Sequence, residues 1–156
     1  MNTVAQVLVE NLLAQGKTIS FAESCTGGMI SETLVNIPGA SEVFGYGFVT
    51  YSNEAKTRLI GVSENVLLTH GAVSEETAVL MAKGAREVSG ADIAISATGI
   101  AGPGGGTPLK PVGLVYIGVA TCKKAEAFRF IFSGDRREVR EQTVQKALQI
   151  AIDKLC

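Results

Sequence analysis

The sequence of 156 residues contains no tryptophan, a single histidine and three cysteines, and it has no long uninterrupted apolar run. Because the cysteines are odd in number and form no C-x-x-C pair, neither a disulfide framework nor a zinc site is indicated. The apolar runs are shorter than the ~18 residues of a membrane helix, and the N-terminus lacks the features of a signal peptide. We therefore expect a soluble cytoplasmic protein that binds neither a membrane nor a metal and keeps its thiols reduced (Cys25, Cys122 and Cys156).

An excess of charge of either sign is also absent. With 14 Lys and Arg against 15 Asp and Glu, the formal net charge is −1, so the cationic face of a nucleic-acid-binding protein is not expected. The apolar content of 46% excludes intrinsic disorder. A chain of this length suits a single domain that spans residues 1–156.

Helix and strand patterns alternate along the chain. Helical spacing is predicted for residues 4–15, 26–36, 53–60, 64–70, 75–88 and 136–155, the last two after the capping residues Ser74 and Asp135. Strand patterns are predicted for residues 18–22, 43–51, 92–97, 112–122 and 125–133. In the helix after Ser74, the inward stripe is expected to consist of Ala78, Met81, Ala85 and Val88.

This order of elements predicts an α/β fold in which helices cover both faces of a mixed sheet. The last two strands are separated only by Lys123 and Lys124, so they are expected to form an antiparallel hairpin. In open α/β sheets, ligands bind at the carboxyl ends of the strands. That rule selects three segments, which follow Ala22, Thr50 and Ala97.

The first segment, A-E-S-C-T-G-G at 22–28, joins a strand to a helix. Unpaired N–H groups and the positive end of the helix favour an oxyanion at such a turn, as acyl transfer requires. Ser24 and Cys25 are both candidate nucleophiles. A tight turn with a buried thiol and a capping Thr26 explains the same pattern without any chemistry.

The second segment, Y-S-N-E-A-K at 51–56, begins a helix. If Ser52 or Asn53 caps that helix, Lys56 lies in its first turn, where the positive helix end and partial burial lower the pKa of the amine. A lysine that can be neutral near pH 7 is a candidate general base. Glu54 opposes this shift if it lies close, and a solvated surface lysine is the simpler alternative.

The third segment runs from Ser96 and Thr98 through the glycine-rich stretch 99–106 to K-P-V-G at 110–113. Successive N–H groups in such a turn can form an anion nest suited to phosphate, although neither the Walker A nor the G-x-G-x-x-G fingerprint is present. A flexible surface loop is the alternative.

Other residues give weaker signals. Arg136 and Arg137 begin the last helix, where the dipole disfavours cations, and this suggests a phosphate or carboxylate contact. His70 precedes Gly71 and is expected at a helix end rather than as a ligand. The alternate residues Phe128, Phe130 and Phe132 are expected to be core residues on one face of the sheet rather than a base-stacking platform.

Taken together, these segments resemble one family. The matching motifs are A-E-S-C-T-G-G (22–28), G-F-V-T-Y-S-N-E-A-K (47–56), H-G-A-V-S (70–74), T-G-I-A-G-P-G-G-G (98–106), K-P-V-G (110–113) and F-S-G-D-R (132–136). From about residue 5 to 152 they are similar to the C-terminal domain of competence/damage-inducible protein A, a family whose stand-alone members are nicotinamide-nucleotide amidohydrolases. The resemblance implies a three-layer α/β/α sandwich with a mixed, mostly parallel sheet of about five strands, no metal or organic cofactor, and a homodimer or larger homo-oligomer.

The resemblance also implies a reaction, the hydrolysis of the carboxamide of nicotinamide mononucleotide, and a set of site residues. The family's nucleophile falls on Ser24, its lysine on Lys56, its assisting tyrosine on Tyr51, and a hydroxyl residue that is serine in many relatives on Thr98. Residues 99–106 and Lys110-Pro111 match the substrate-binding loop. Substrate contacts are expected from Cys25, Thr26, Gly27, Gly28, Asn53, Gly99, Gly102, Gly104, Gly105, Lys110 and Arg136.

These expectations combine in one mechanism. Neutral Lys56, positioned by Tyr51 or Thr98, removes the proton of Ser24, which attacks the carboxamide carbon while N–H groups around Thr26 and Gly27 hold the oxyanion. Two alternatives stay open. One is a catalytically weak nucleotide-binding or regulatory paralogue, and the other is an amidase with a different nucleotide-like substrate.

Overall fold

The computed structural model describes residues 1–155. Its strands are β1 (Ile19–Glu23), β2 (Phe44–Val49), β3 (Ile93–Gly99), β4 (Leu114–Ala120) and β5 (Ala125–Ile131). Its helices are α1 (Val4–Gln15), α2 (Met29–Val35), α3 (Ala40–Val43), α4 (Asn53–Ile60), α5 (Glu64–His70), α6 (Glu75–Ser89) and α7 (Arg136–Lys154). In these described residues, no helix combines the length and the apolar character needed to cross a membrane.

The strands form one mixed sheet in the order β2-β1-β3-β4-β5. The central strand pairs β1–β2 and β1–β3 are parallel, whereas β3–β4 and β4–β5 are antiparallel. Only β4 runs against the other four strands, so the sheet is mixed and mostly parallel in strand direction, as expected. No crossover helix separates β3 from β4 or β4 from β5, so each of these two connections reverses the direction of the chain.

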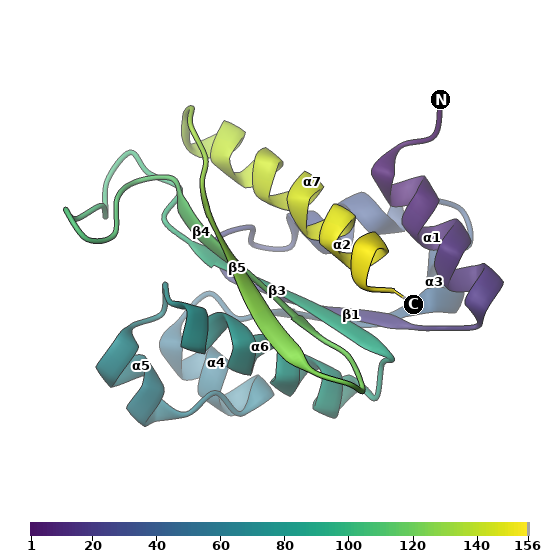
Figure 1. Ribbon diagram of the computed structural model, residues 1–156, viewed down its shortest axis with the longest axis horizontal. Coiled ribbons are helices and arrows are strands. Elements are labelled where there is room, and N and C mark those ends of the chain that lie inside the picture. Colours follow the sequence, from purple (N-terminus) through teal and green to yellow (C-terminus); the bar gives the residue numbers. More distant parts are fainter. Residues whose placement is uncertain (156) are drawn as a thin grey trace.

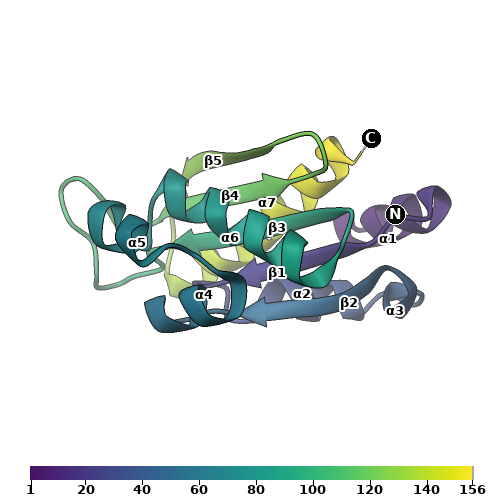
Figure 2. The ribbon, with the colours of Figure 1, turned by 90° about the horizontal axis from the view of Figure 1, so that it is seen from below.

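Helices cover both faces of this sheet. Figure 1 shows α1, α2 and α7 on one face and α4, α5 and α6 on the other, and Figure 2 shows the order of the strands. Successive β1 residues point to opposite faces, so Phe21 belongs to the core under α1 and α7 while Ala22 belongs to the smaller core under α6. The fold is the three-layer α/β/α sandwich that the sequence predicts.

Serine caps define the helices that position the site. The side chains of Ser52, Ser63 and Ser74 accept hydrogen bonds from the first turns of α4, α5 and α6, so these helices begin where they were predicted. The helix predicted from residue 26 begins at Met29 instead. Gly27 and Gly28 have φ angles of 58° and 104°, which a right-handed helix excludes.

Phe128, Phe130 and Phe132 pack against the larger core, as expected. The short helix α3 was not predicted. Val88 is 54% exposed and does not continue the inward stripe of α6, because Ser89 takes the inward position and its Oγ donates a hydrogen bond to Ser20 Oγ.

Candidate active site

The ends of three strands meet beside Ser24. The Ser24 N–H donates to Ala97 O at 2.9 Å, and the Thr50 N–H donates to Glu23 O at 2.8 Å. These bonds extend the parallel registers of β1 with β3 and β2 by one residue. Ser24 therefore lies between Thr50 and Thr98 at the carboxyl edge of the parallel strands, as the sequence predicts.

Lys56 reaches this edge from α4. Its Nζ donates hydrogen bonds to Ser24 Oγ at 2.9 Å and to Thr50 O at 2.8 Å. The side chain is 1% exposed, and no carboxylate forms an ion pair with it among residues 1–155. The Thr50 carbonyl and the burial of the side chain therefore keep the Lys56 amine beside the Ser24 hydroxyl.

Burial lowers the pKa of Lys56 from 10.5 to about 8. The direction of the expected shift is confirmed, but its cause is removal from water rather than the positive end of α4. Glu54 does not oppose the shift, because it is exposed and pairs with Arg58 at 2.9 Å. With this pKa, roughly a tenth of the Lys56 amines are neutral at pH 7.

Cys25 follows Ser24 but lies in a different environment. Burial raises the pKa of its thiol to about 12, although the nearby Arg140 acts in the opposite direction. The thiol is therefore protonated at neutral pH and is a poor nucleophile. Of the two candidates at this turn, only Ser24 has a base within hydrogen-bond distance.

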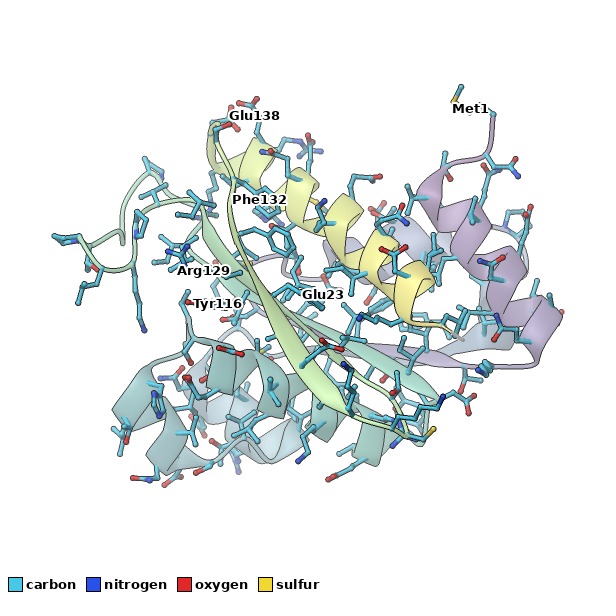
Figure 3. All side chains as sticks on the ribbon, in the orientation of Figure 1. Met1, Glu23, Tyr116, Arg129, Phe132 and Glu138 are labelled. Carbon is cyan, nitrogen blue, oxygen red and sulfur yellow. The ribbon has the colours of Figure 1, made fainter. Side chains whose placement is uncertain are left out.

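A buried carboxylate organises the turn that carries Ser24. Glu23 is fully buried in the interior (Figure 3). It accepts hydrogen bonds from Thr26 Oγ1 at 2.6 Å, from the N–H groups of Ile30 and Ser31, and from Ser31 Oγ. Because these donors include the first turn of α2, Glu23 both caps that helix and fixes the turn before it.

The oxyanion donors differ in part from the expectation. The Gly27 N–H donates to Ser24 O at 3.1 Å and is therefore already used. The Thr26 N–H has no backbone or side-chain acceptor within residues 1–155, so it remains available. Arg140 supports the turn from α7 through hydrogen bonds to the carbonyls of Cys25 and Thr26, at 3.1 and 2.9 Å.

Neither Tyr51 nor Thr98 makes a hydrogen bond to Lys56 among the described residues. The Tyr51 hydroxyl accepts a hydrogen bond from Arg136 Nη2 at 3.0 Å, while Arg136 Nη1 donates to Gly102 O at 2.9 Å. The Thr98 hydroxyl donates to Ala72 O at 2.8 Å. Thr50, through its carbonyl, is the residue that positions the amine in their place.

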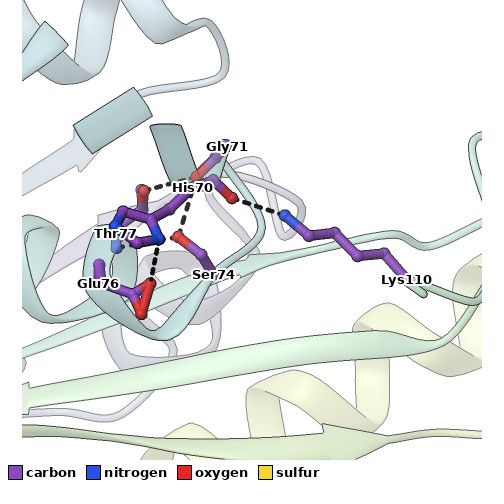
Figure 4. Close-up of polar contacts among 6 residues, drawn as sticks. All are labelled: His70, Gly71, Ser74, Glu76, Thr77 and Lys110. Carbon is purple, nitrogen blue, oxygen red and sulfur yellow. Dashed lines mark hydrogen bonds and ion pairs between the residues drawn. The ribbon is translucent and has the colours of Figure 1, made fainter. Parts of the chain in front are cut away.

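The glycine-rich loop between β3 and β4 is attached at both sides of this edge. Arg136 holds it at Gly102, where φ is 81°. On the other side, Lys110 Nζ donates to His70 O at 2.6 Å at the end of α5 (Figure 4). The His70 ring pairs with Glu76 at 3.2 Å, so His70 is a helix-end residue and not part of the Ser24–Lys56 pair.

The other residues predicted to contact the substrate lie along two separate hollows or are glycines of the connecting loops. Arg136 and Arg137 line a hollow of about 500 Å³ with Ala101, Pro103, Val112, Gly134 and Asp135, beside the glycine-rich loop. Asn53 lines a different hollow, between α4 and α5. Gly28 and Gly105 have φ angles of 104° and 88°, Gly99 packs closely against Val115, and a Cβ at Gly104 would meet nothing within 4 Å. In residues 1–155, no three His, Cys, Asp or Glu side chains gather as metal ligands would.

Comparison with known proteins identifies the family of this chain. The profile of the CinA C-terminal domain matches residues 1–155. The chain belongs to the CinA C-terminal domain family. A CinA-like protein from Endomicrobium trichonymphae is 53% identical over 154 residues, which are 99% of this chain and 36% of that protein. Another from Chloroherpeton thalassium is 55% identical over 150 residues, or 94% and 36% of the two chains.

Solved structures of this family have the same fold. The crystal structure of a competence/damage inducible protein from Agrobacterium tumefaciens matches with a TM-score of 0.94 at 42% identity, over 96% of this chain and 92% of that chain. The chain spans about a third of the length of its curated CinA-like relatives, 36% in each case given above.

Three residues of this CinA domain were not predicted to act at the site: Glu23, Thr50 and Arg140. Glu23 is an acidic residue in a strand that is otherwise uncharged and mostly apolar, and that mismatch is a signal in the sequence. Arg140 follows Arg136 by one turn in the N-terminal half of α7, where cations are disfavoured. Thr50 acts through its backbone carbonyl, which no side-chain motif can reveal.

Proposed function

We propose that this domain hydrolyses the carboxamide of nicotinamide mononucleotide to nicotinate mononucleotide and ammonia. The observation that carries the proposal is the 2.9 Å hydrogen bond between Lys56 Nζ and Ser24 Oγ, in which the amine is buried and its pKa lies near 8. A base of this kind is what a serine nucleophile requires. The choice of substrate rests on the resemblance of the sequence motifs to nicotinamide-nucleotide amidohydrolases.

In the first half of the reaction, neutral Lys56 takes the proton of Ser24 Oγ as the oxygen attacks the carboxamide carbon. The tetrahedral intermediate carries its negative charge on the former carbonyl oxygen, towards which the free Thr26 N–H supplies a hydrogen bond. The carbon–nitrogen bond then breaks, and the Lys56 ammonium returns its proton to the departing nitrogen, which leaves as ammonia.

The second half hydrolyses the ester formed on Ser24. A water molecule gives a proton to Lys56 and attacks the acyl carbon, after which the carbon–Oγ bond breaks and Lys56 returns the proton to Ser24 Oγ. The product is a pyridine carboxylic acid, which ionises to the carboxylate and gives its proton to the released ammonia in solution. Lys56 therefore carries one proton back and forth in each half, as an amine with a pKa near the working pH can do.

The same proposal assigns the nucleotide to the region between the glycine-rich loop and the start of α7. Arg136 joins Gly102 and Tyr51 there and lines the hollow of about 500 Å³ together with Arg137. A cation fixed by two neutral oxygens retains its charge for a phosphate. Arg137 pairs with Glu141 at 2.8 Å and is therefore the weaker candidate.

The test is the release of ammonia from nicotinamide mononucleotide by the purified protein, compared with Ser24→Ala and Lys56→Met. We expect turnover in the wild type and a loss of several powers of ten in both variants. Nicotinamide and its riboside serve as competing substrates at equal concentration, and preference for the mononucleotide identifies the phosphate as recognised. Binding of the mononucleotide without ammonia release would contradict the proposal and favour a binding module.

A further inference from the structure

A buried hydroxyl beside the Ser24–Lys56 pair lacks a hydrogen-bond partner. Thr50 is fully buried, and both of its backbone groups are bonded, because its N–H donates to Glu23 O and its carbonyl accepts from Lys56 Nζ. Its hydroxyl oxygen, by contrast, has no partner among residues 1–155. Burying a hydroxyl without a partner costs stability, since its hydrogen bonds to water are lost and not replaced. A second state of the site that uses this hydroxyl would offset that cost.

The Lys56 amine has the complementary deficit. Within the described part of the chain it has two hydrogen-bond acceptors, Ser24 Oγ and Thr50 O, whereas an ammonium has three N–H groups. When the neutral amine accepts a hydrogen bond from the Ser24 hydroxyl, it keeps two N–H groups, and Thr50 O accepts one of them. In both forms one N–H is left over, and bulk water does not reach it because the side chain is 1% exposed. A donor and an acceptor that both lack partners therefore belong to two residues in direct contact.

We propose that the Thr50 hydroxyl accepts this remaining N–H and so stabilises the Lys56 ammonium that forms when Ser24 loses its proton. The carbonyl oxygen of Thr50 is 2.8 Å from Nζ, and in threonine the hydroxyl and carbonyl oxygens are each two bonds from Cα. Rotation about χ1 moves the hydroxyl between staggered positions without any movement of the backbone. Thr50 is thus a positioning residue that acts through Lys56 and does not touch the substrate. Its role in turnover rests on the proposed function, whereas its effect on the amine does not.

The hydroxyl is expected to favour the charged form of Lys56. A hydrogen bond in which the donor is ionised is roughly twice as strong as a neutral one, so the contact stabilises the ammonium more than the amine. It acts against burial, which lowers the pKa of Lys56. Removal of the hydroxyl should therefore lower this pKa further and make neutral Lys56 a weaker base for the Ser24 proton.

The charged and titratable groups around Lys56 do not supply this contact within residues 1–155. The Cys25 thiol is protonated at neutral pH, since burial raises its pKa to about 12. On β1, Glu23 accepts its hydrogen bonds from the turn before α2 and from α2 itself, and on α4, Glu54 pairs with another residue of that helix. Strand β2 contains no charged residue. The helices α5 and α6 pack against α4, and none of their charged side chains forms an ion pair or hydrogen bond with Lys56.

The pKa of Lys56 tests the proposal without any substrate. It is followed as the pH is raised through the NMR shift of the Lys56 ε-carbon, which is assigned by its absence in Lys56→Met. Thr50→Val removes the hydroxyl and keeps the shape of the side chain, and we expect the pKa of Lys56 to lie about one pH unit below that of the wild type. Thr50→Ser keeps the hydroxyl and should retain the wild-type pKa. An unchanged pKa in Thr50→Val would overturn the proposal.

Thr57 offers a matched control. Its hydroxyl oxygen is also buried and without a partner in the described residues, but it lines the hollow between α4 and α5. Since successive helix residues do not face each other, Thr57→Val should leave the pKa of Lys56 unchanged. Thr50→Ala is a second variant without the hydroxyl and should lower the pKa as Thr50→Val does, and circular dichroism shows whether each variant is folded. An equal fall of the pKa in the Thr57 and Thr50 variants would contradict a specific role of Thr50.

Ammonia release from nicotinamide mononucleotide separates this inference from the proposed function. We expect Thr50→Val to lower kcat about tenfold on the high-pH plateau with KM unchanged, and Thr50→Ser to restore most of the rate. A Thr50→Val variant with the wild-type kcat would contradict a role of the hydroxyl in turnover. If the wild type releases no ammonia but Thr50→Val still lowers the pKa of Lys56, the proposed substrate is refuted and the contact between Thr50 and Lys56 is supported.

Discussion

Burial of Lys56 links catalysis to folding stability. Its pKa is about 8 in the folded chain against 10.5 in the unfolded chain, so between these pH values the unfolded state binds more protons. The cost of burying the amine is therefore complete below pH 8 and disappears as the pH rises towards 10.5. At pH 7 it amounts to about 3 kcal/mol.

Lys56→Met should reveal this cost. We expect the difference in unfolding free energy, variant minus wild type, to fall by about 3 kcal/mol between pH 7 and pH 10.5, because only the wild type gains stability over that range. The lost hydrogen bond to Thr50 O shifts the difference by a constant amount. Urea unfolding at several pH values measures it, with the exposed Lys83→Met as the control. A difference that does not change with pH would show that Lys56 keeps its ordinary pKa.

Substitutions at the neighbouring residues Ser24 and Cys25 distinguish a hydroxyl nucleophile from a thiol nucleophile. Since burial raises the pKa of Cys25 to about 12 and its side chain is only 8% exposed, we expect Cys25→Ala to retain activity within about an order of magnitude. Ser24→Ala should lose several powers of ten. Ammonia release measures both. The reverse ranking would make the thiol the nucleophile.

Helix packing decides where the amine of Lys56 lies. α4 carries Lys56 and ends at Ile60, whose backbone lies directly against Gly84 of α6. A Cβ at position 84 would be 2.9 Å from the Ile60 carbonyl carbon and closer still to its oxygen, and a backbone group cannot move aside as a flexible side chain can. The glycine is therefore required for the close approach of the two helices.

Gly84→Ala is the corresponding prediction for helix packing. In an exposed helix this substitution adds up to about 1 kcal/mol of stability. Here we expect a loss of about 1–3 kcal/mol, together with reduced activity, because α4 is pushed away from α6 and Lys56 moves from Ser24. Thermal unfolding and ammonia release are measured in parallel, with Lys83→Ala on the exposed side of α6 as the control. A stabilised and fully active variant would contradict this packing.

The sequence predicts the helices with clear caps best. α6 begins after Ser74 and α4 after Ser52, one of its two candidate caps, since capping is a local interaction between residues three apart. Val88 and the start of α2 were misplaced for tertiary reasons. In α6 a hydrogen bond from Ser89 to Ser20 decides which side of the helix faces inward, and Gly27 and Gly28 take backbone angles that delay the beginning of α2.

At the scale of the whole molecule, the site exists because the sheet brings three chain segments together. Ser24 and Lys56 are 32 residues apart, and the register of β1 with β2 and β3 makes them neighbours. Residue types and strand ends could be predicted from the sequence. The partners of Tyr51 and Thr98 could not, because they depend on where α7 and residues 71–74 lie on the finished fold.

The pH dependence of kcat/KM for the release of ammonia from nicotinamide mononucleotide tests the central claim most directly. If the neutral amine of Lys56 activates Ser24, kcat/KM should rise about tenfold per pH unit below an apparent pKa near 8 and level off above it. A rate that is already constant from pH 6 to pH 9 would contradict the account, because the Lys56 amine would then not be the base.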